Sequence, residues 1–308
     1  MHLKSFLKDC FKEYEEIKEQ NDAFKLIKKH LNSTEPLPHG TAFQQTRNHQ
    51  IVWQFWENPK TANTTGTKLV SQCLTSIDQF IWDGYERKLL DLEISKQYIL
   101  FPPFVYSKLQ ASLPGFGLTA FSDILRLALL SSYGGIWLDA TMLALRPLKD
   151  TYLLNRDSTG FSFKRSGSEN FKTRKKWRHY NPGYFSWSYF SRVKWLNSFI
   201  VSGRDRDTLN KTLQILLSIW KEESRYPHYF TTQIIHEHLI KKQGFKDFEY
   251  LSDVPVHYLQ KYAYHKYDEN IFQSIKESSP LQKMSWKMPF LNKSGGDRFL
   301  NHLLNTGP

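Results

Sequence analysis

The chain has 308 residues, of which 40% are hydrophobic and 15% aromatic, so it is too apolar for a disordered protein and long enough for one large domain or two small ones. Its two cysteines, Cys10 and Cys73, exclude a disulfide framework and favour a reducing compartment. No stretch approaches the roughly 18 apolar residues of a membrane span, and the N-terminus lacks the apolar core of a signal peptide. We therefore expect a cytoplasmic protein, with peripheral attachment to the cytoplasmic face of the membrane as an alternative.

Positive charge is concentrated in one part of the chain. Between Lys164 and Arg206 there are eleven Lys and Arg against two acids, so this segment carries +9 of the formal charge of +12. Such a patch indicates an anionic partner, namely phosphate, nucleic acid or an acidic membrane surface. A solubilising face is the simpler alternative.

Apolar residues at helical spacing predict a helix over residues 3–31. Its charges nearly cancel, which favours docking on the main domain over contact with a membrane. Residues 32–43, with two prolines and a glycine, are typical of a linker. We therefore predict an N-terminal helical extension and linker over 1–48, followed by the main domain over 49–308.

Strands and helices alternate in the main domain, which indicates an α/β fold. The expected elements in chain order are a strand at 50–59, a helix at 71–80, a strand at 85–94, a helix at 121–135, a strand at 136–141 and helices at 207–223 and 230–245. Ser122 is the expected N-cap of the helix that Gly134 and Gly135 close. From 151 to 206 the chain is basic, aromatic and irregular, so about 155–206 is interpreted as an insertion, and the tail at 278–300 as a loop.

Three charged residues follow one another closely in the middle of the chain. Asp123 and Arg126 are three residues apart on a predicted helix, so they share a face. Asp139 follows an apolar strand and should emerge at the C-terminal edge of the sheet, where open α/β sheets bind ligands. A surface ion pair beside an unrelated strand-end aspartate is the alternative.

The motif S-D-I-L-R at 122–126, followed by G-G-I-W-L-D at 134–139, resembles the core of a group of GT-A-type glycosyltransferases. This group includes the capsular polysaccharide synthesis proteins, fungal mannosyltransferases and clostridial glucosylating toxins, and the resemblance covers about 50–148. It implies a GT-A-like, Rossmann-like mixed sheet flanked by helices. It also implies a hexosyltransferase that takes a sugar from a nucleotide-sugar, with UDP as the favoured nucleotide. The reaction would retain the anomeric configuration of the sugar. The acceptor would be a lipid-linked oligosaccharide in capsular or surface polysaccharide synthesis.

The resemblance assigns roles to individual residues. Asp123 would bind hydroxyls of the donor sugar, Arg126 would reach the sugar or the diphosphate, and Asp139 matches the first acid of the D-x-D motif. It further implies donor-binding residues in four places. These are Trp53, Gln54 and Trp56 in the first strand, Gly134 and Gly135 in the glycine turn, Thr141 in the D-x-D motif, and Lys283, Ser285 and Trp286 in a C-terminal lid. Either Trp53 or Trp56 would stack on the base, and Lys283 would offset the charge of the leaving diphosphate.

Thr141 stands where the family has the second acid, which coordinates Mn²⁺ or Mg²⁺. A threonine hydroxyl is a weaker ligand than a carboxylate for a hard cation. Three alternatives stay open: a metal held weakly by Asp139 and water, a metal held by other residues, and no metal.

Aromatic residues within the basic segment suit the acceptor side. Trp177, Tyr184, Trp187 and Trp195 are candidates for stacking on sugars, while the Lys and Arg residues would meet the diphosphate of a lipid-linked acceptor or an anionic membrane. Two other functions remain as alternatives. One is a single-stranded nucleic-acid-binding protein, which does not explain the paired motifs, and the other is a degenerate relative that binds the donor without transferring it.

Overall fold

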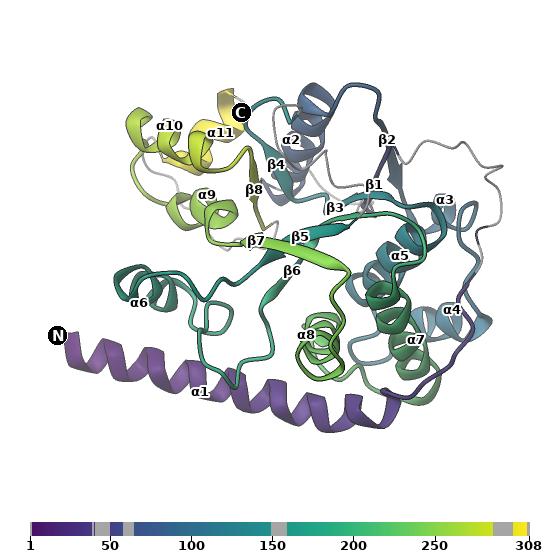
Figure 1. Ribbon diagram of the computed structural model, residues 1–308. Coiled ribbons are helices and arrows are strands. Elements are labelled where there is room, and N and C mark those ends of the chain that lie inside the picture. Colours follow the sequence, from purple (N-terminus) through teal and green to yellow (C-terminus); the bar gives the residue numbers. More distant parts are fainter. Residues whose placement is uncertain are drawn as a thin grey trace.

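The computed structural model describes residues 2–38, 40, 50–57, 65–148, 159–285 and 298–306, which form a mixed α/β fold (Figure 1). Six strands make the central sheet, in the order β2-β1-β3-β6-β5-β7. Their bounds are β1 Ile51–Phe55, β2 Glu86–Leu90, β3 Gly135–Leu138, β5 Gly160–Lys164, β6 Trp195–Ser202 and β7 Phe248–Ser252. Strands β4 (Met142–Ala144) and β8 (Leu281–Lys283) form a separate two-stranded sheet. The predicted α/β class with a mixed sheet is confirmed.

Helices cover both faces of the central sheet (Figure 1). Their bounds are α1 His2–Ile27, α2 Thr65–Phe80, α3 Leu92–Ser95, α4 Pro103–Gln110, α5 Leu118–Tyr133, α6 Phe171–Tyr180, α7 Asp207–Glu222, α8 Thr231–Gln243, α9 Tyr258–Tyr262, α10 Glu269–Ser278 and α11 Phe299–Thr306. Two 3-10 turns, Lys28–His30 and Pro255–His257, complete the described elements. Helices α5, α7 and α8 share one hydrophobic core with the sheet, and α2 and β4 belong to the core of the other face.

The alternation of side chains along β1 and β3 explains these two layers. Trp53 and Trp137 lie side by side in the parallel register and point into the core that contains α5. Val52 and Ile136 are also paired, and they point to the opposite face. Since both strands are buried on both faces, their sequences are apolar apart from Gln54, as expected for central parallel strands.

The turn from α5 into β3 depends on two glycines. Gly134 has φ 69° and Gly135 has φ 100°, a region of backbone conformation that residues with a side chain rarely adopt. A Cβ atom on Gly135 would lie 2.5 Å from the carbonyl oxygen of Ile51, so no larger residue fits beside β1. The helix begins earlier than expected, with Gly117 as N-cap, and the predicted capping role of Ser122 is therefore wrong.

The segment at 155–206 is not an irregular insertion. It supplies β5, α6 and β6, and both strands lie inside the central sheet. The expected loop at 278–300 also contains the strand β8. In the first segment, basic residues obscure the largely apolar strands β5 and β6, and β8 (Leu-Gln-Lys) is too short and polar to be recognised from its sequence.

The N-terminal helix α1 runs along one side of the molecule and packs on α8 and α6 (Figure 1). Gln20, Ala23 and Ile27 are buried in this contact, whereas Phe11 and Tyr14, nearer the N-terminus, are exposed. None of the helices in the described part of the chain combines the length and the apolar character needed to cross a membrane.

Candidate active site

The polar cluster expected from the sequence lies at one edge of the central sheet. Because β1 and β3 are parallel, both strands end at the same edge, where Trp56 follows β1 and Asp139 follows β3. The Asp139 amide donates a hydrogen bond to the carbonyl of Ser198 on the neighbouring strand, which fixes the backbone where the strand ends. Helix α5, which packs against this sheet, brings Asp123 and Arg126 to the same place.

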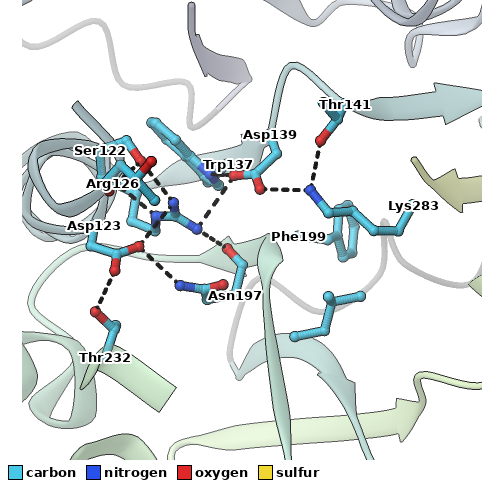
Figure 2. Close-up of polar contacts among 12 residues, drawn as sticks. Ser122, Asp123, Arg126, Trp137, Asp139, Thr141, Asn197, Phe199, Thr232 and Lys283 are labelled. Carbon is cyan, nitrogen blue, oxygen red and sulfur yellow. Dashed lines mark hydrogen bonds and ion pairs between the residues drawn. The ribbon is translucent and has the colours of Figure 1, made fainter. Parts of the chain in front are cut away.

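Arg126 lies between the two acids, as Figure 2 shows. Its Nη2 is 3.0 Å from Oδ1 of Asp123, and its Nη1 is 3.3 Å from Oδ1 of Asp139. On the other side of Asp139, Nζ of Lys283 is 2.9 Å from Oδ2 and donates a hydrogen bond of 2.6 Å to the hydroxyl of Thr141. The structure therefore brings together five of the residues that the resemblance implied, in one chain of charged and polar contacts.

Two residues that the sequence analysis missed complete the support of Asp123. The amide of Asn197 on β6 donates to Oδ1 of Asp123 at 3.1 Å, and the hydroxyl of Thr232 on α8 donates to Oδ2 at 2.8 Å. The Asn197 carbonyl also accepts a hydrogen bond of 2.6 Å from Arg126. An asparagine within the apolar run of a buried strand was the available signal, since a buried amide needs polar partners.

The two carboxyl groups have opposite electrostatic environments. Burial raises the pKa of Asp123, and Arg126 offsets this only in part. Burial also acts to raise the pKa of Asp139, but Lys283 and Arg126 outweigh it and hold this pKa well below the usual range. Asp139 therefore stays ionised at neutral pH and can accept hydrogen bonds from a ligand.

Exposure separates the residues that a ligand can touch from those that support them. The side chains of Asp123 and Arg126 are 5% and 4% exposed, whereas those of Asp139 and Lys283 are 23% and 19% exposed. Asp139 and Lys283 therefore present the accessible surface of the cluster. Tyr229, which lies two residues before α8 and is exposed, was also missed from the sequence. Burial around its hydroxyl and the carboxylates of Asp139 and Asp123 raise its pKa.

Several predicted donor-binding residues have structural roles instead. Trp53 does not fit base stacking, because its ring is fully buried and its indole N–H donates to the carbonyl of Gly134 at 2.9 Å. Gly134 precedes β3 and Gly135 is its first residue, so both lie at the opposite end of the strand from Asp139, where they form the turn. A donor role for these two glycines is therefore wrong.

The remaining donor-side predictions stay open. Trp56 is half-buried at the sheet edge, which makes it the better placed of the two tryptophans for stacking on a base. Gln54 is fully buried on β1, and its amide nitrogen has no partner among the described residues. Ser285 follows β8 and is half-buried, and Trp286 lies outside the described residues.

The four aromatic residues proposed for the acceptor do not form one surface. Trp177 is buried against Phe185, and Trp195 is buried and stacked on the ring of His236, so neither can stack on a sugar. Tyr184 and Trp187 are half-buried, and both pack against the guanidinium of Arg165. Only these two retain any exposed surface for a ligand.

Part of the basic segment is neutralised within the fold, which weakens the nucleic-acid alternative. Lys164 pairs with Glu237, Arg165 with Asp253 and Arg178 with Glu13. Trp177 and Trp195 are also buried, whereas Phe171, Tyr189 and Phe190 of the same segment are exposed. The ion pairs, rather than a lack of aromatic surface, therefore count against this alternative.

Of the two acids of a D-x-D motif, this chain has only the first, Asp139, as a possible metal ligand. Within residues 65–148, 159–285 and the shorter described stretches, no group of three or more His, Cys, Asp or Glu is arranged to hold a metal ion. The neighbouring Thr141 hydroxyl is already bonded to Lys283.

Comparisons with known proteins address the family of the chain. A solved structure described as "PaToxG Glycosyltransferase" is similar over 74% of this chain and 80% of its own length, at 13% sequence identity and a TM-score of 0.39. No curated protein sequence matches the chain significantly. The family model described as capsular polysaccharide synthesis protein matches residues 4–303. The chain therefore belongs to the capsular polysaccharide synthesis protein family, and the glycosyltransferase class implied by S-D-I-L-R and G-G-I-W-L-D is confirmed.

Proposed function

We propose that this glycosyltransferase takes its sugar from a nucleotide diphosphate-sugar bound over Asp139 and Lys283. The observation that carries the proposal is the joined cluster of Asp123, Arg126, Asp139 and Lys283 at the C-terminal edge of the sheet. Its partly exposed carboxylate suits sugar hydroxyls, and its partly exposed ammonium suits a diphosphate. UDP is the proposed nucleotide, in keeping with the resemblance to related transferases.

Within this cluster, the buried pair of Asp123 and Arg126 acts as a support. Asp123 accepts from Asn197 and Thr232, and Arg126 donates to the carbonyls of Ser122 and Asn197. These contacts fix the guanidinium beside Asp139 before any ligand arrives, so little reorganisation accompanies binding.

A calorimetric titration tests this proposal. We expect UDP and a UDP-sugar to bind at one site per chain, and GDP and single-stranded oligonucleotides to bind at least about 10-fold more weakly, a difference of about 1.4 kcal/mol. Tight, salt-sensitive binding of oligonucleotides with no heat from any nucleotide-sugar would instead favour the nucleic-acid alternative.

We further propose that the acceptor is carried on an anionic lipid that enters a groove between α1 and α6. This groove has a volume of about 820 Å³. Helix α1 lines one side, α6 the other, and residues 187–190 complete it. The lining residues are Cys10, Glu13, Tyr14, Ile17, Lys18, Asn21, Asp22 and Lys25 of α1, Phe171, Arg174, Lys175 and Arg178 of α6, and Trp187, Ser188 and Phe190. Phe171 and Phe190 are 75% and 69% exposed, and α6 carries five Lys or Arg and no acid. Exposed aromatic surface beside positive charge is the chemistry that an acyl or prenyl chain with a phosphate headgroup requires.

Vesicle sedimentation tests the groove. We expect the wild-type protein to bind vesicles containing a polyprenyl diphosphate more strongly than neutral vesicles, and the exposed-charge variant Lys172→Glu/Lys175→Glu to lose most of this binding. The matched control Lys266→Glu/Lys276→Glu makes the same charge change around α10, far from α1 in Figure 1, and should bind normally. Vesicles of phosphatidylglycerol distinguish a general anionic surface from the prenyl lipid, and equal binding to neutral vesicles would contradict the proposal.

A further inference from the structure

The side chain of Lys283 occupies the space between the two positions of the D-x-D motif (Figure 2). It reaches Oδ2 of Asp139 at 2.9 Å and the hydroxyl of Thr141 at 2.6 Å. In the two-acid form of the motif, as the resemblance implies it, both of these positions would carry carboxylates, and the second would coordinate a divalent cation. Here a fixed ammonium lies against the one remaining carboxylate.

Backbone hydrogen bonds place Lys283 beside the D-x-D segment. Strand β8 pairs antiparallel with β4, and the register sets Lys283 opposite Met142. Next to this pair, the amide of Met284 donates to the carbonyl of Thr141 at 2.9 Å. The lysine thus comes from a strand that is hydrogen-bonded to the D-x-D segment itself, and its position does not depend on a mobile side chain alone.

A divalent cation does not fit among these residues. Both oxygens of Asp139 are engaged, because Oδ1 accepts the indole N–H of Trp137 at 2.8 Å and lies 3.3 Å from Arg126, and Oδ2 is bonded to Lys283. Mg²⁺ and Mn²⁺ prefer several oxygen ligands, and here they would meet one carboxylate beside two positive charges, which repel a cation but not a neutral sugar hydroxyl. The described donor set therefore supports an ammonium better than a metal ion.

Charge balance leads to the same conclusion. Two carboxylates and a divalent cation have a net charge of zero, and one carboxylate with one ammonium also has a net charge of zero. Exchanging the second acid for Thr141 and the metal for Lys283 therefore leaves the local charge that faces a diphosphate unchanged. An ammonium has three donors, and the described residues take two of them, so one remains for a phosphate oxygen.

From this geometry we infer that the Lys283 ammonium replaces the divalent cation of the donor site, and that sugar transfer by this chain needs no metal. The inference rests on the proposed nucleotide-sugar donor. In the transfer step, the acceptor hydroxyl oxygen forms a bond to the anomeric carbon. The bond from that carbon to the β-phosphate oxygen breaks, with its electron pair going to the phosphate, and the hydroxyl proton passes to the same departing oxygen. Lys283 stabilises the negative charge that develops there.

Metal removal is the first test. We expect calorimetric binding of the UDP-sugar, and the rate of transfer or donor hydrolysis, to change less than twofold between EDTA and Mn²⁺. Electron paramagnetic resonance of added Mn²⁺ should show no protein-bound ion in the presence of UDP. Nucleotide binding that requires Mn²⁺ would overturn this inference while leaving the proposed function intact. The absence of nucleotide binding under both conditions would instead overturn the proposed function.

Exchanging the two residues supplies the second test. Lys283→Met keeps the volume of the side chain and removes its charge, so kcat should fall about 10²–10³-fold, the range for losing one preorganised group that stabilises a developing charge. The double variant Lys283→Ala/Thr141→Asp carries acids at positions 139 and 141, with space for a cation where the ammonium was. Its transfer activity should therefore exceed that of Lys283→Met when Mn²⁺ is present and vanish in EDTA. Lys266→Met is the matched control. If the double variant stays independent of metal and Lys283→Met is fully active, the lysine does not perform this role.

Discussion

Replacing Asp139 with asparagine is expected to lower kcat/KM for sugar transfer by about 10²–10³-fold. The substitution keeps the shape of the side chain and removes the charge that pairs with Lys283 at 2.9 Å and with Arg126 at 3.3 Å. Both cations would then lie beside a neutral amide, and the ammonium would lose the partner that holds it in place. Steady-state kinetics with a UDP-sugar measures this effect.

The control for this variant is Asp83→Asn. Asp83 is exposed and precedes β2, so it lies at the opposite edge of the parallel strands from Asp139. It should retain wild-type kinetics and the wild-type melting temperature. A normally folded Asp139→Asn protein with full activity would show that the carboxylate takes no part in the reaction.

Replacing Asp253 with alanine is expected to lower the free energy of unfolding by about 3–5 kcal/mol. Its carboxylate forms a bidentate ion pair with Arg165 at 2.7 and 3.0 Å, and neither side chain is more than 1% exposed. Removing the acid leaves a buried guanidinium without its counter-charge, between the ends of β5 and β7. Urea denaturation followed by circular dichroism measures the change.

Two further variants separate this effect from a general loss of packing. Arg165→Met/Asp253→Leu removes both charges, and it should recover part of the stability because no unpaired charge remains buried. Lys96→Ala breaks an exposed ion pair with Glu93 and should leave the midpoint nearly unchanged. If Asp253→Ala were as stable as the wild type, the pair would not hold this end of the sheet together.

The sequence predicted those site residues that lie close together along the chain. Asp123, Arg126 and Asp139 lie within 17 residues, on a helix and the strand after it, so the periodicity of each element and the edge rule for open sheets suffice to place them together. Asn197 and Thr232 come from β6 and α8, and no local pattern indicates which buried polar residue will meet Asp123. Their positions depend on the strand order.

Composition could not predict which of the aromatic residues are buried. Trp177 and Trp195 carry the same chemistry as Trp187, but only Trp187 keeps exposed surface, because the other two lie in the hydrophobic cores. Strands β5 and β6 were missed for a related reason. The basic residues of the segment dominate its composition, whereas the apolar run of β6 is what predicts a strand covered on both faces.

The most direct test of the central claim is the titration of UDP and a UDP-sugar into the wild-type protein, Asp139→Asn and Asp83→Asn. The claim is that the cluster at the sheet edge binds the donor. It predicts one site per chain in the wild type and in Asp83→Asn, and binding of the UDP-sugar at least about 10-fold weaker in Asp139→Asn, where the ionised acceptor of the sugar hydroxyls is lost. Equal affinity for all three proteins, or no binding to any of them, would contradict it.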